Sequence, residues 1–445
     1  MERGKCVMEK LNKNFLDSID GKNLNFLIGA GASSSSLKTI SHNDKKEKGK
    51  ETVPSIEDLF NKYENDRIAA ALLKFIFFSM SVKNGLITAH TIRDKRAIEN
   101  LKNYKILIKN IITLLNSTGF ERPKRANIFT TNYDTFFELA FDQIAHMHPL
   151  AYFNDGSRGF FTREVSYENY FFNISHSGSM DTYRREIPSI NLYKMHGSLS
   201  WDKKTIDKDD IIISSNTNPV LDSLTKAKNK DNESFYEKLY QEINIFYTNL
   251  KNPGSSNESE ETIKKVTEEE LLINFECLLN NLKKTEIKSA TDSNTSLKKK
   301  LREDLRKFKE IYDALLVVNP TKTKFKETVF EEQYYQLFRA FEEELQKPNS
   351  VLIVFGFSFK DKHINDILKR CLTNPTLQVF VVPYSQKDEL NVKEIFTGYG
   401  NVSFLKEESE SKDKDLANEN IEYKNGDFDV LNDFLSGKND INEHN

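Results

Sequence analysis

The chain has 445 residues, enough for one large domain with insertions or for two ordinary domains with a substantial buried core. Its 64 basic and 67 acidic residues give a formal net charge of -3 and are interspersed, which disfavours nucleic-acid binding through bulk electrostatics. The three cysteines, Cys6, Cys277 and Cys371, form no CxxC pair, so we expect neither a disulfide framework nor a structural zinc site.

Residues 1–20 are charged and have the apolar spacing of an amphipathic helix. They lack the apolar core and the small-residue cleavage site of a signal peptide. The most apolar stretch, Ile68–Val82, contains Lys74 and is too short to span a membrane. We therefore expect a soluble, cytoplasmic protein that does not bind a membrane.

Short apolar runs that predict buried strands alternate with segments of helical periodicity. In chain order, the predicted elements are a strand at 24–28, helices at 56–77 and 97–115, a strand at 126–130, a helix from near Asp134, a strand at 190–195, helices near 235–250, 266–282 and 297–312, a strand at 314–318, a helix at 327–345, a strand at 351–355, a helix at 361–372, strands at 378–382 and 401–405, and a helix near 428–435. This alternation predicts an α/β fold with a doubly wound, mostly parallel, Rossmann-like sheet and a helical insertion.

The composition between these elements suggests the domain boundaries. Residues 33–51 are polar and charged, which predicts a mobile loop, and residues 146–187 lack clean periodicity, which predicts irregular structure over a pocket. The expected division is an α/β domain of residues 1–200 and 314–405, a mainly helical insertion of residues 201–313, and an acidic C-terminal segment of residues 406–445 with one helix.

Four short motifs follow predicted strands. They are GAGAS at Gly29–Ser33, TTNYD at Thr130–Asp134, KMHGS at Lys194–Ser198 and GFSFKDKHI at Gly356–Ile364. Ligands of open α/β sheets bind where strands end and helices begin, so the four motifs predict one dinucleotide site assembled from distant segments.

The first two motifs have chemistry that suits such a ligand. Gly29, Ala30 and Gly31 let the backbone approach a pyrophosphate, although the same pattern also suits a tight turn without a ligand. Asn132 and Asp134 could hold a carboxamide and ribose hydroxyls or stabilise developing positive charge. The alternative for Asp134 is that it caps the following helix.

The other two motifs offer an imidazole and a hydroxyl. His196 follows a strand, where it could act as a general base in a cleft, and a purely structural histidine is the alternative. Gly356 and Ser358 lie at a strand tip, where N–H groups and a hydroxyl could bind ribose or phosphate. Asp361 begins the next helix and could simply be its N-cap.

Taken in order, the four motifs resemble the sirtuin-like NAD-binding domain, in the form found in bacterial antiphage-defence proteins rather than in protein deacetylases. The likeness covers about Phe15–Ser200 and Leu315–Leu405. The resemblance assigns Gly29, Ala30, Gly31 and Ser33 to the NAD diphosphate turn, Asn132 and Asp134 to the nicotinamide-ribose region, His196 to the catalytic histidine, and Gly356 with Ser358 to the adenosine ribose. We also include Thr131 and Asp361 among the candidate cofactor-binding residues.

The chain also departs from the deacetylases. Three scattered cysteines cannot supply their four-cysteine zinc module, and Thr131 stands where they usually have glutamine. The resemblance therefore implies an NAD+ hydrolase that cleaves NAD+, as substrate and without a metal, to nicotinamide and ADP-ribose in antiphage defence. An NAD-dependent protein deacylase and a non-catalytic NAD or ADP-ribose-sensing subunit of an ATPase complex are the alternatives.

The resemblance also implies partners. It suggests a homo-oligomer and association with a HerA-type hexameric ATPase. The sequence has no Walker motif GxxxxGK[ST], so we expect any ATPase activity to belong to another chain.

Overall fold

The computed structural model describes residues 14–37, 54–119, 124–205, 208–214, 216–227, 233–251, 266–284, 293–318, 331–406, 408–409, 422–423 and 425–437. Of the amphipathic helix expected over residues 1–20, residues 14–20 belong to this part of the chain, and residues 14–19 are helical. Most of the loop expected at residues 33–51 lies outside the described residues.

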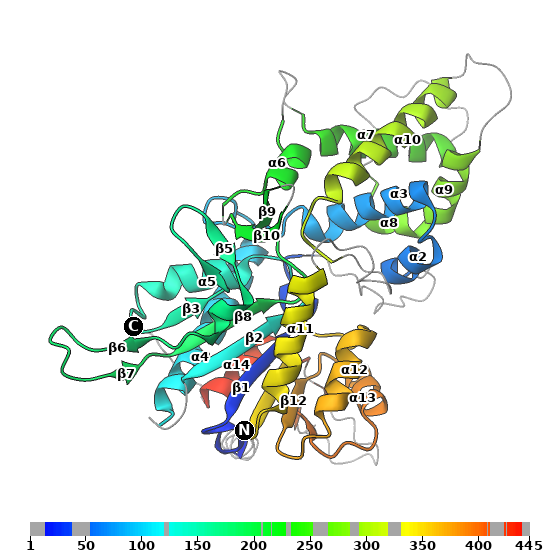
Figure 1. Cartoon of the computed structure of the whole chain (residues 1–445). Helices are drawn as coiled ribbons and strands as arrows, with labels where there is room; N and C mark the ends of the chain where they lie inside the picture. Colours follow the sequence, from blue (N-terminus) through cyan, green and yellow to red (C-terminus); the bar gives the residue numbers. More distant parts are fainter. Residues whose placement is uncertain are drawn as a thin grey trace, which may run out of the picture.

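Seven parallel strands form the central sheet, in the order β13-β12-β11-β1-β2-β8-β3 (Figure 1). Their bounds are Asn23–Ile28 for β1, Arg125–Thr130 for β2, Tyr152–Asn154 for β3, Ser189–Lys194 for β8, Ser350–Phe355 for β11, Gln378–Val382 for β12 and Val402–Phe404 for β13. The central strands are almost wholly buried and rich in apolar residues because helices cover both faces of the sheet. This arrangement confirms the α/β fold with a parallel sheet.

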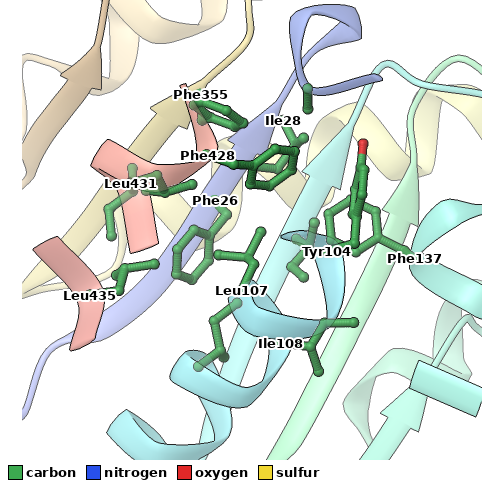
Figure 2. Packing of buried hydrophobic residues seen from close by; sticks show 14 of the residues in the cluster. Phe26, Ile28, Tyr104, Leu107, Ile108, Phe137, Phe355, Phe428, Leu431 and Leu435 are labelled. Carbon is green, nitrogen blue, oxygen red and sulfur yellow. The ribbon is translucent and has the colours of Figure 1, made fainter. Parts of the chain in front are cut away.

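Two layers of helices bury the two faces. The helices are α4 (Lys95–Ser117), α5 (Phe136–Ala145) and α14 (Phe428–Ser436) on one face, and α11 (Glu331–Gln346), α12 (Lys362–Cys371) and α13 (Gln386–Ile395) on the other. Figure 2 shows Phe26 of β1, Leu107 of α4 and Phe428 of α14 meeting in one apolar cluster. The C-terminal helix is therefore part of the core that supports the sheet.

The remaining helices pack into a separate cluster beside the sheet (Figure 1). They are α2 (Ile56–Lys62), α3 (Arg67–Phe77), α6 (Pro219–Thr225), α7 (Phe235–Lys251), α8 (Glu268–Ile273), α9 (Phe275–Lys283) and α10 (Ser293–Tyr312), with a short π-helical turn at Phe78–Val82. Two separate stretches of the chain thus build this helical region.

The single helix predicted over residues 56–77 is wrong, because the chain forms two helices there. The carboxylate of Asp66 accepts hydrogen bonds from the N–H groups of Ile68 and Ala69, both 3.1 Å long, and so begins a new helix. A short acidic side chain at this place competes with helix continuation.

Small antiparallel sheets were not predicted. One of them has four strands in the order β4 (Ser157–Arg158), β5 (Arg163–Val165), β10 (Lys208–Ile213) and β9 (Trp201–Thr205). Two further sheets have two strands each, β6 (Ser175–His176) with β7 (Arg185–Glu186) and β14 (Glu408–Ser409) with β15 (Glu422–Tyr423). The expectation of irregular structure at residues 146–187 is therefore wrong in part, since this stretch supplies β3 to β7. These strands have only two or three residues each, too few for a periodic sequence pattern.

The strand predicted at residues 314–318 is also wrong. Val317 forms only an isolated antiparallel bridge with Gly197, just beyond the end of β8. β2 pairs with all of β8, whereas β3 pairs only with Ser189–Asn191 on the other side, and the returning chain meets β8 only beyond its last residue. It packs instead against the turn that carries His196.

A row of buried asparagines crosses four neighbouring strands. Asn25, Asn127, Asn191 and Asn154 face one another in register on β1, β2, β8 and β3. Three of the four amide nitrogens donate to the next amide oxygen over 2.9 to 3.1 Å, from Asn127 to Asn25, from Asn191 to Asn127 and from Asn154 to Asn191. The row thus provides hydrogen-bond partners for four asparagine side chains that are 4% exposed or less.

The topology brings the four motifs to one edge of the sheet. Ile28 pairs with both Phe355 and Thr130, and Thr130 pairs with Lys194, so the strands end at one level. The chain leaves β1 toward β2 and later returns to β11 on the other side, which makes this edge the place where ligands of doubly wound sheets bind. Every helix in the described ranges is too short or too polar to span a bilayer.

Candidate functional site at the carboxyl edge of the sheet

The turns after β1 and β11 interlock through their backbones. The N–H of Gly31 donates to the carbonyl of Gly356 over 2.8 Å, and the N–H of Gly29 donates to Phe355 over 3.0 Å. A Cβ atom on Gly29 would lie 2.5 Å from the Gly356 oxygen, and one on Gly31 would lie 2.8 Å from the Gly356 Cα. The close packing of the two turns therefore requires glycine at both positions. Binding of a diphosphate by this turn, in which Ala30 is exposed, stays a prediction.

Ser33 connects this turn to the turn after β2. Its hydroxyl donates to Oδ2 of Asp134 over 2.8 Å, shares a 2.8 Å hydrogen bond with the Tyr104 hydroxyl, and accepts from Nδ2 of Asn132 over 3.4 Å. All four residues are 5% exposed or less. The Ser33 side chain therefore lies inside this network rather than at the surface of the turn.

Asp134 supports the start of α5. Its Oδ1 atom accepts the N–H of Phe136, the first residue of α5, over 3.2 Å, although the N-cap position itself is occupied by Thr135. Burial raises the pKa of the Asp134 carboxyl, while Lys194 and the Ser33 hydrogen bond oppose this rise. The carboxylate is thus directed at Ser33 and at the helix, which makes it a support for the turn.

Asn132 has an unused acceptor. Its Oδ1 atom is buried and accepts no hydrogen bond from the part of the chain that the structure describes. Its own N–H donates to Oγ1 of Thr130 over 3.0 Å, and the N–H of the half-buried Thr131 donates to Ile28 over 3.2 Å. A buried carbonyl normally has a donor, so this oxygen is suited to a ligand hydroxyl or amide.

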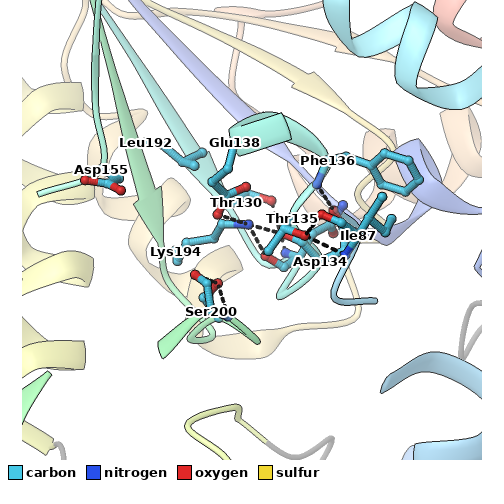
Figure 3. A network of polar contacts seen from close by, with 12 residues as sticks. Ile87, Thr130, Asp134, Thr135, Phe136, Glu138, Asp155, Leu192, Lys194 and Ser200 are labelled. Carbon is cyan, nitrogen blue, oxygen red and sulfur yellow. Dashed lines mark hydrogen bonds and ion pairs between the residues drawn. The ribbon is translucent and has the colours of Figure 1, made fainter. Parts of the chain in front are cut away.

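Lys194 is a buried residue of the site that sequence reasoning missed. Its side chain is 3% exposed, and its Nζ atom lies 3.2 Å from Oε1 of Glu138. The same ammonium donates to the carbonyl of Asn132 over 3.4 Å and to the carbonyl of Asp134 (Figure 3). Burial raises the pKa of Glu138, and Lys194 opposes this rise. A lysine at the end of a predicted buried strand, directly before the motif that carries His196, was the available signal.

His196 is held by the turn after β8. Gly197 has a φ of +82°, and a Cβ atom there would overlap the carbonyl of Leu316, so this turn requires glycine. The N–H of Val318 donates to the carbonyl of His196 over 2.9 Å. The backbone around the imidazole is therefore fixed from both sides.

His196 faces a carboxylate from another motif. Its Nε2 atom lies 3.3 Å from Oδ2 of Asp361, and the two side chains are 12% and 10% exposed. Oδ1 of Asp361 accepts the N–H of His363 over 3.1 Å and caps α12. Asp361 is therefore both the N-cap considered from the sequence and a partner of the histidine.

The turn that carries Ser358 has an unusual backbone. Ser358 is exposed, and the next residue, Phe359, has a φ of +55°, a left-handed conformation that is rare for a bulky side chain. Nδ2 of Asn365 donates to the Phe359 carbonyl over 2.6 Å and stabilises this conformation. Strained backbone of this kind concentrates at binding and catalytic sites.

The predicted residues thus form two groups at one edge of the sheet. Ser33, Asn132 and Asp134 share one hydrogen-bond network, and His196 with Asp361 forms a second group. The N–H of Leu199 donates to the carbonyl of Tyr133 over 2.9 Å and joins the turns that carry the two groups. Gly356 packs against the first turn, whereas Ser358 contributes an exposed hydroxyl near the start of α12.

Comparison with known protein families gives a match to part of the chain. Residues 126–252 match the SIR2-like domain, a range that contains Asn132, Asp134, Lys194 and His196. A SIR2-like domain implies an NAD-related activity of the sirtuin type. No curated protein shows a significant match to this chain.

Proposed function

We propose that this chain is an NAD+ glycohydrolase that cleaves NAD+ to nicotinamide and ADP-ribose. The observation that carries the proposal is the buried Oδ1 atom of Asn132, which has no donor in the described part of the chain. It lies at the sheet edge where doubly wound folds bind dinucleotides, within the range of the SIR2-like match. The carboxamide of nicotinamide or a ribose hydroxyl supplies the missing donor.

Cleavage of the bond between nicotinamide and ribose builds positive charge on the sugar ring. The carbonyl dipole of Asn132 stabilises this charge, and Asp134 acts behind it by holding Ser33 and the start of α5. Nicotinamide leaves with the bonding electron pair, and the oxygen of a water molecule bonds to the anomeric carbon.

His196 takes the proton of the attacking water in this proposal. The Asp361 carboxylate beside Nε2 stabilises the imidazolium that results. The turns around Ala30 and Ser358, both exposed at this edge, are proposed to hold the diphosphate and the adenosine ribose, with Thr131 at the nicotinamide-ribose side.

A wider role is also part of the proposal. The resemblance of the four motifs supports NAD+ depletion in bacterial antiphage defence, by a homo-oligomer that associates with a HerA-type hexameric ATPase. This part of the proposal rests on the sequence motifs.

The test measures nicotinamide release from NAD+ by purified protein, alone and with the ATPase. We expect Asn132→Ala and His196→Ala each to lower the rate at least ~100-fold, a loss usual for a general base or an electrostatic group. His90→Ala, at an exposed histidine, is the matched control and should keep the wild-type rate.

Other outcomes favour the alternatives. Release that requires an acyl-lysine peptide would indicate a protein deacylase. Tight NAD+ binding without turnover, even with the ATPase present, would indicate a sensor. Full activity in both Asn132→Ala and His196→Ala would overturn the assignment of these residues.

A further inference from the structure

We infer that Lys194 is a positioning residue of this site, which holds the turn of Asn132 and Asp134 from the interior and so sets the direction of the Asn132 side chain. The kinetic part of this inference rests on the proposed function. Its structural part, that Lys194 holds the backbone of the Asn132–Asp134 turn, does not depend on the proposed function.

The ammonium group of Lys194 is matched by its surroundings. It carries three N–H donors, and the three oxygens within reach are the carbonyls of Asn132 and Asp134 and the carboxylate of Glu138. The side chain reaches them because Lys194 pairs with Thr130, the last residue of β2, directly before the turn. Figure 3 shows Lys194 pointing from β8 toward this turn.

The two sides of the turn are held by different parts of the protein. Its N–H groups are bound through Thr131 to Ile28 and through Asn132 to Thr130, both on the strands. Its carbonyl groups are bound by Lys194. With the backbone of Asn132 fixed on both sides, its buried Oδ1 atom keeps one direction.

Stability alone does not account for a lysine at this position. A buried ammonium loses its hydration, and an apolar side chain of similar shape often replaces a buried ion pair without loss of stability. Methionine would fill the same space but could not bind the two carbonyls. What the ammonium group supplies here, and methionine cannot, is the set of hydrogen bonds to the carbonyls of the Asn132–Asp134 turn.

The experiment compares Lys194→Met with the same substitution at Lys124. Lys124 is also 3% exposed but directly precedes β2, at the opposite end of that strand. For NAD+ hydrolysis, we expect Lys194→Met to lower kcat at least ~10-fold with little change in KM, because displacement of a reacting group by about 1 Å has effects of this size. Lys124→Met should keep the wild-type kcat.

A double variant separates positioning from charge balance. Lys194→Met leaves the Glu138 carboxylate buried without its cation, so loss of folding alone could lower activity. In Lys194→Met combined with Glu138→Gln, the Glu138 charge is removed while Asp134 still lacks the nearby ammonium group, and we expect the melting temperature to recover in part while kcat stays low. Recovery of kcat together with the melting temperature would overturn the inference.

Amide hydrogen exchange tests the turn without reference to catalysis. We expect exchange at residues 131–136 to be faster in Lys194→Met and in the double variant than in wild type or Lys124→Met. Unchanged exchange in this segment would overturn the inference. Absence of nicotinamide release from wild type would instead count against the proposed function, and the exchange measurement would still decide the role of Lys194.

Discussion

The Nε2 atom of His196 lies 3.3 Å from the Oδ2 atom of Asp361, which joins the turn after β8 to the start of α12. The other oxygen of the same carboxylate accepts the N–H of His363. The carboxylate therefore cannot turn away from the imidazole without uncapping the helix. One side chain links the position of α12 to the orientation of the histidine.

This link predicts that Asp361→Asn separates catalysis from stability. Asparagine caps helices as well as aspartate does, so α12 should remain intact, but the neutral amide cannot stabilise an imidazolium. We expect nicotinamide release to fall ~100-fold or more with an unchanged melting temperature. Asp366→Asn, within α12, is the control, and wild-type activity in Asp361→Asn would show that the pair has no role in the reaction.

The interlocked glycine turns predict a large loss of stability on Gly356→Ala. Gly356 has a φ of +64°, and a Cβ atom would overlap the backbone nitrogen of Ala32, which cannot move aside as a side chain could. We expect the free energy of unfolding to fall by about 3 kcal/mol or more, measured by urea denaturation.

Gly21 provides the matched control for this prediction. It has a φ of +62°, but a Cβ atom there would meet nothing within 4 Å. Gly21→Ala should therefore cost only the strain of a left-handed alanine, about 1 kcal/mol. Equal losses in the two variants would mean that the close packing of the turns is unimportant.

The row of asparagines predicts that Asn127→Leu is strongly destabilising. The substitution removes the donor to Asn25 and the acceptor of Asn191 while both amides stay buried. We expect a loss of about 2 to 4 kcal/mol in the free energy of unfolding, since each unsatisfied buried polar group costs about 1 to 3 kcal/mol. Asn116→Leu, at an exposed position of α4, should change stability by less than about 0.5 kcal/mol. A similarly small change in Asn127→Leu would contradict this account.

The pair of Glu342 and Arg370 predicts a pH-dependent contribution to stability. Two hydrogen bonds of 2.9 Å from Arg370 join α12 to α11 and lower the pKa of Glu342 below its ordinary value of 4.5. The unfolded chain then binds a proton at higher pH than the folded chain does. The stabilisation is therefore fully present above pH 4.5 and is lost as the pH falls through the folded pKa.

Urea denaturation of wild type and Glu342→Gln at several pH values measures this contribution. Because the two side chains are 34% and 55% exposed, we expect a difference of at most about 1 kcal/mol at pH 7. The difference in the free energy of unfolding between wild type and Glu342→Gln should become smaller in acid. Arg370→Gln should differ from wild type in the same way. A difference that grows as the pH falls would contradict the sign of the effect.

The strands that are buried on both faces could be predicted from the sequence. Runs such as Leu24–Ile28 and Val351–Phe355 are mostly apolar because helices cover both sides of the sheet there. The apolar run at residues 314–318 has the same appearance but is buried against a turn. Apolar composition reports burial and does not report which neighbour the backbone pairs with.

In the candidate site, too, some features could be predicted from the sequence and others could not. The positions of the four motifs at strand ends could be predicted, because they follow apolar runs directly. The contact of His196 with Asp361 depends on the strand order, and the burial of Lys194 depends on the turn beyond the neighbouring strand. Both are properties of the folded chain, and the roles of all these residues in catalysis stay predictions.

The four asparagines of the central strands also set a condition on evolutionary change. Each amide is hydrogen-bonded to the next one, so replacing a single asparagine leaves its neighbours without a hydrogen-bond partner. Replacing the whole row by apolar residues removes donors and acceptors together. Lineages that carry this sheet should therefore keep the complete row or lose it as a unit. Paired substitutions at positions 25, 127, 191 and 154 would then be visible as correlated columns in an alignment of homologues.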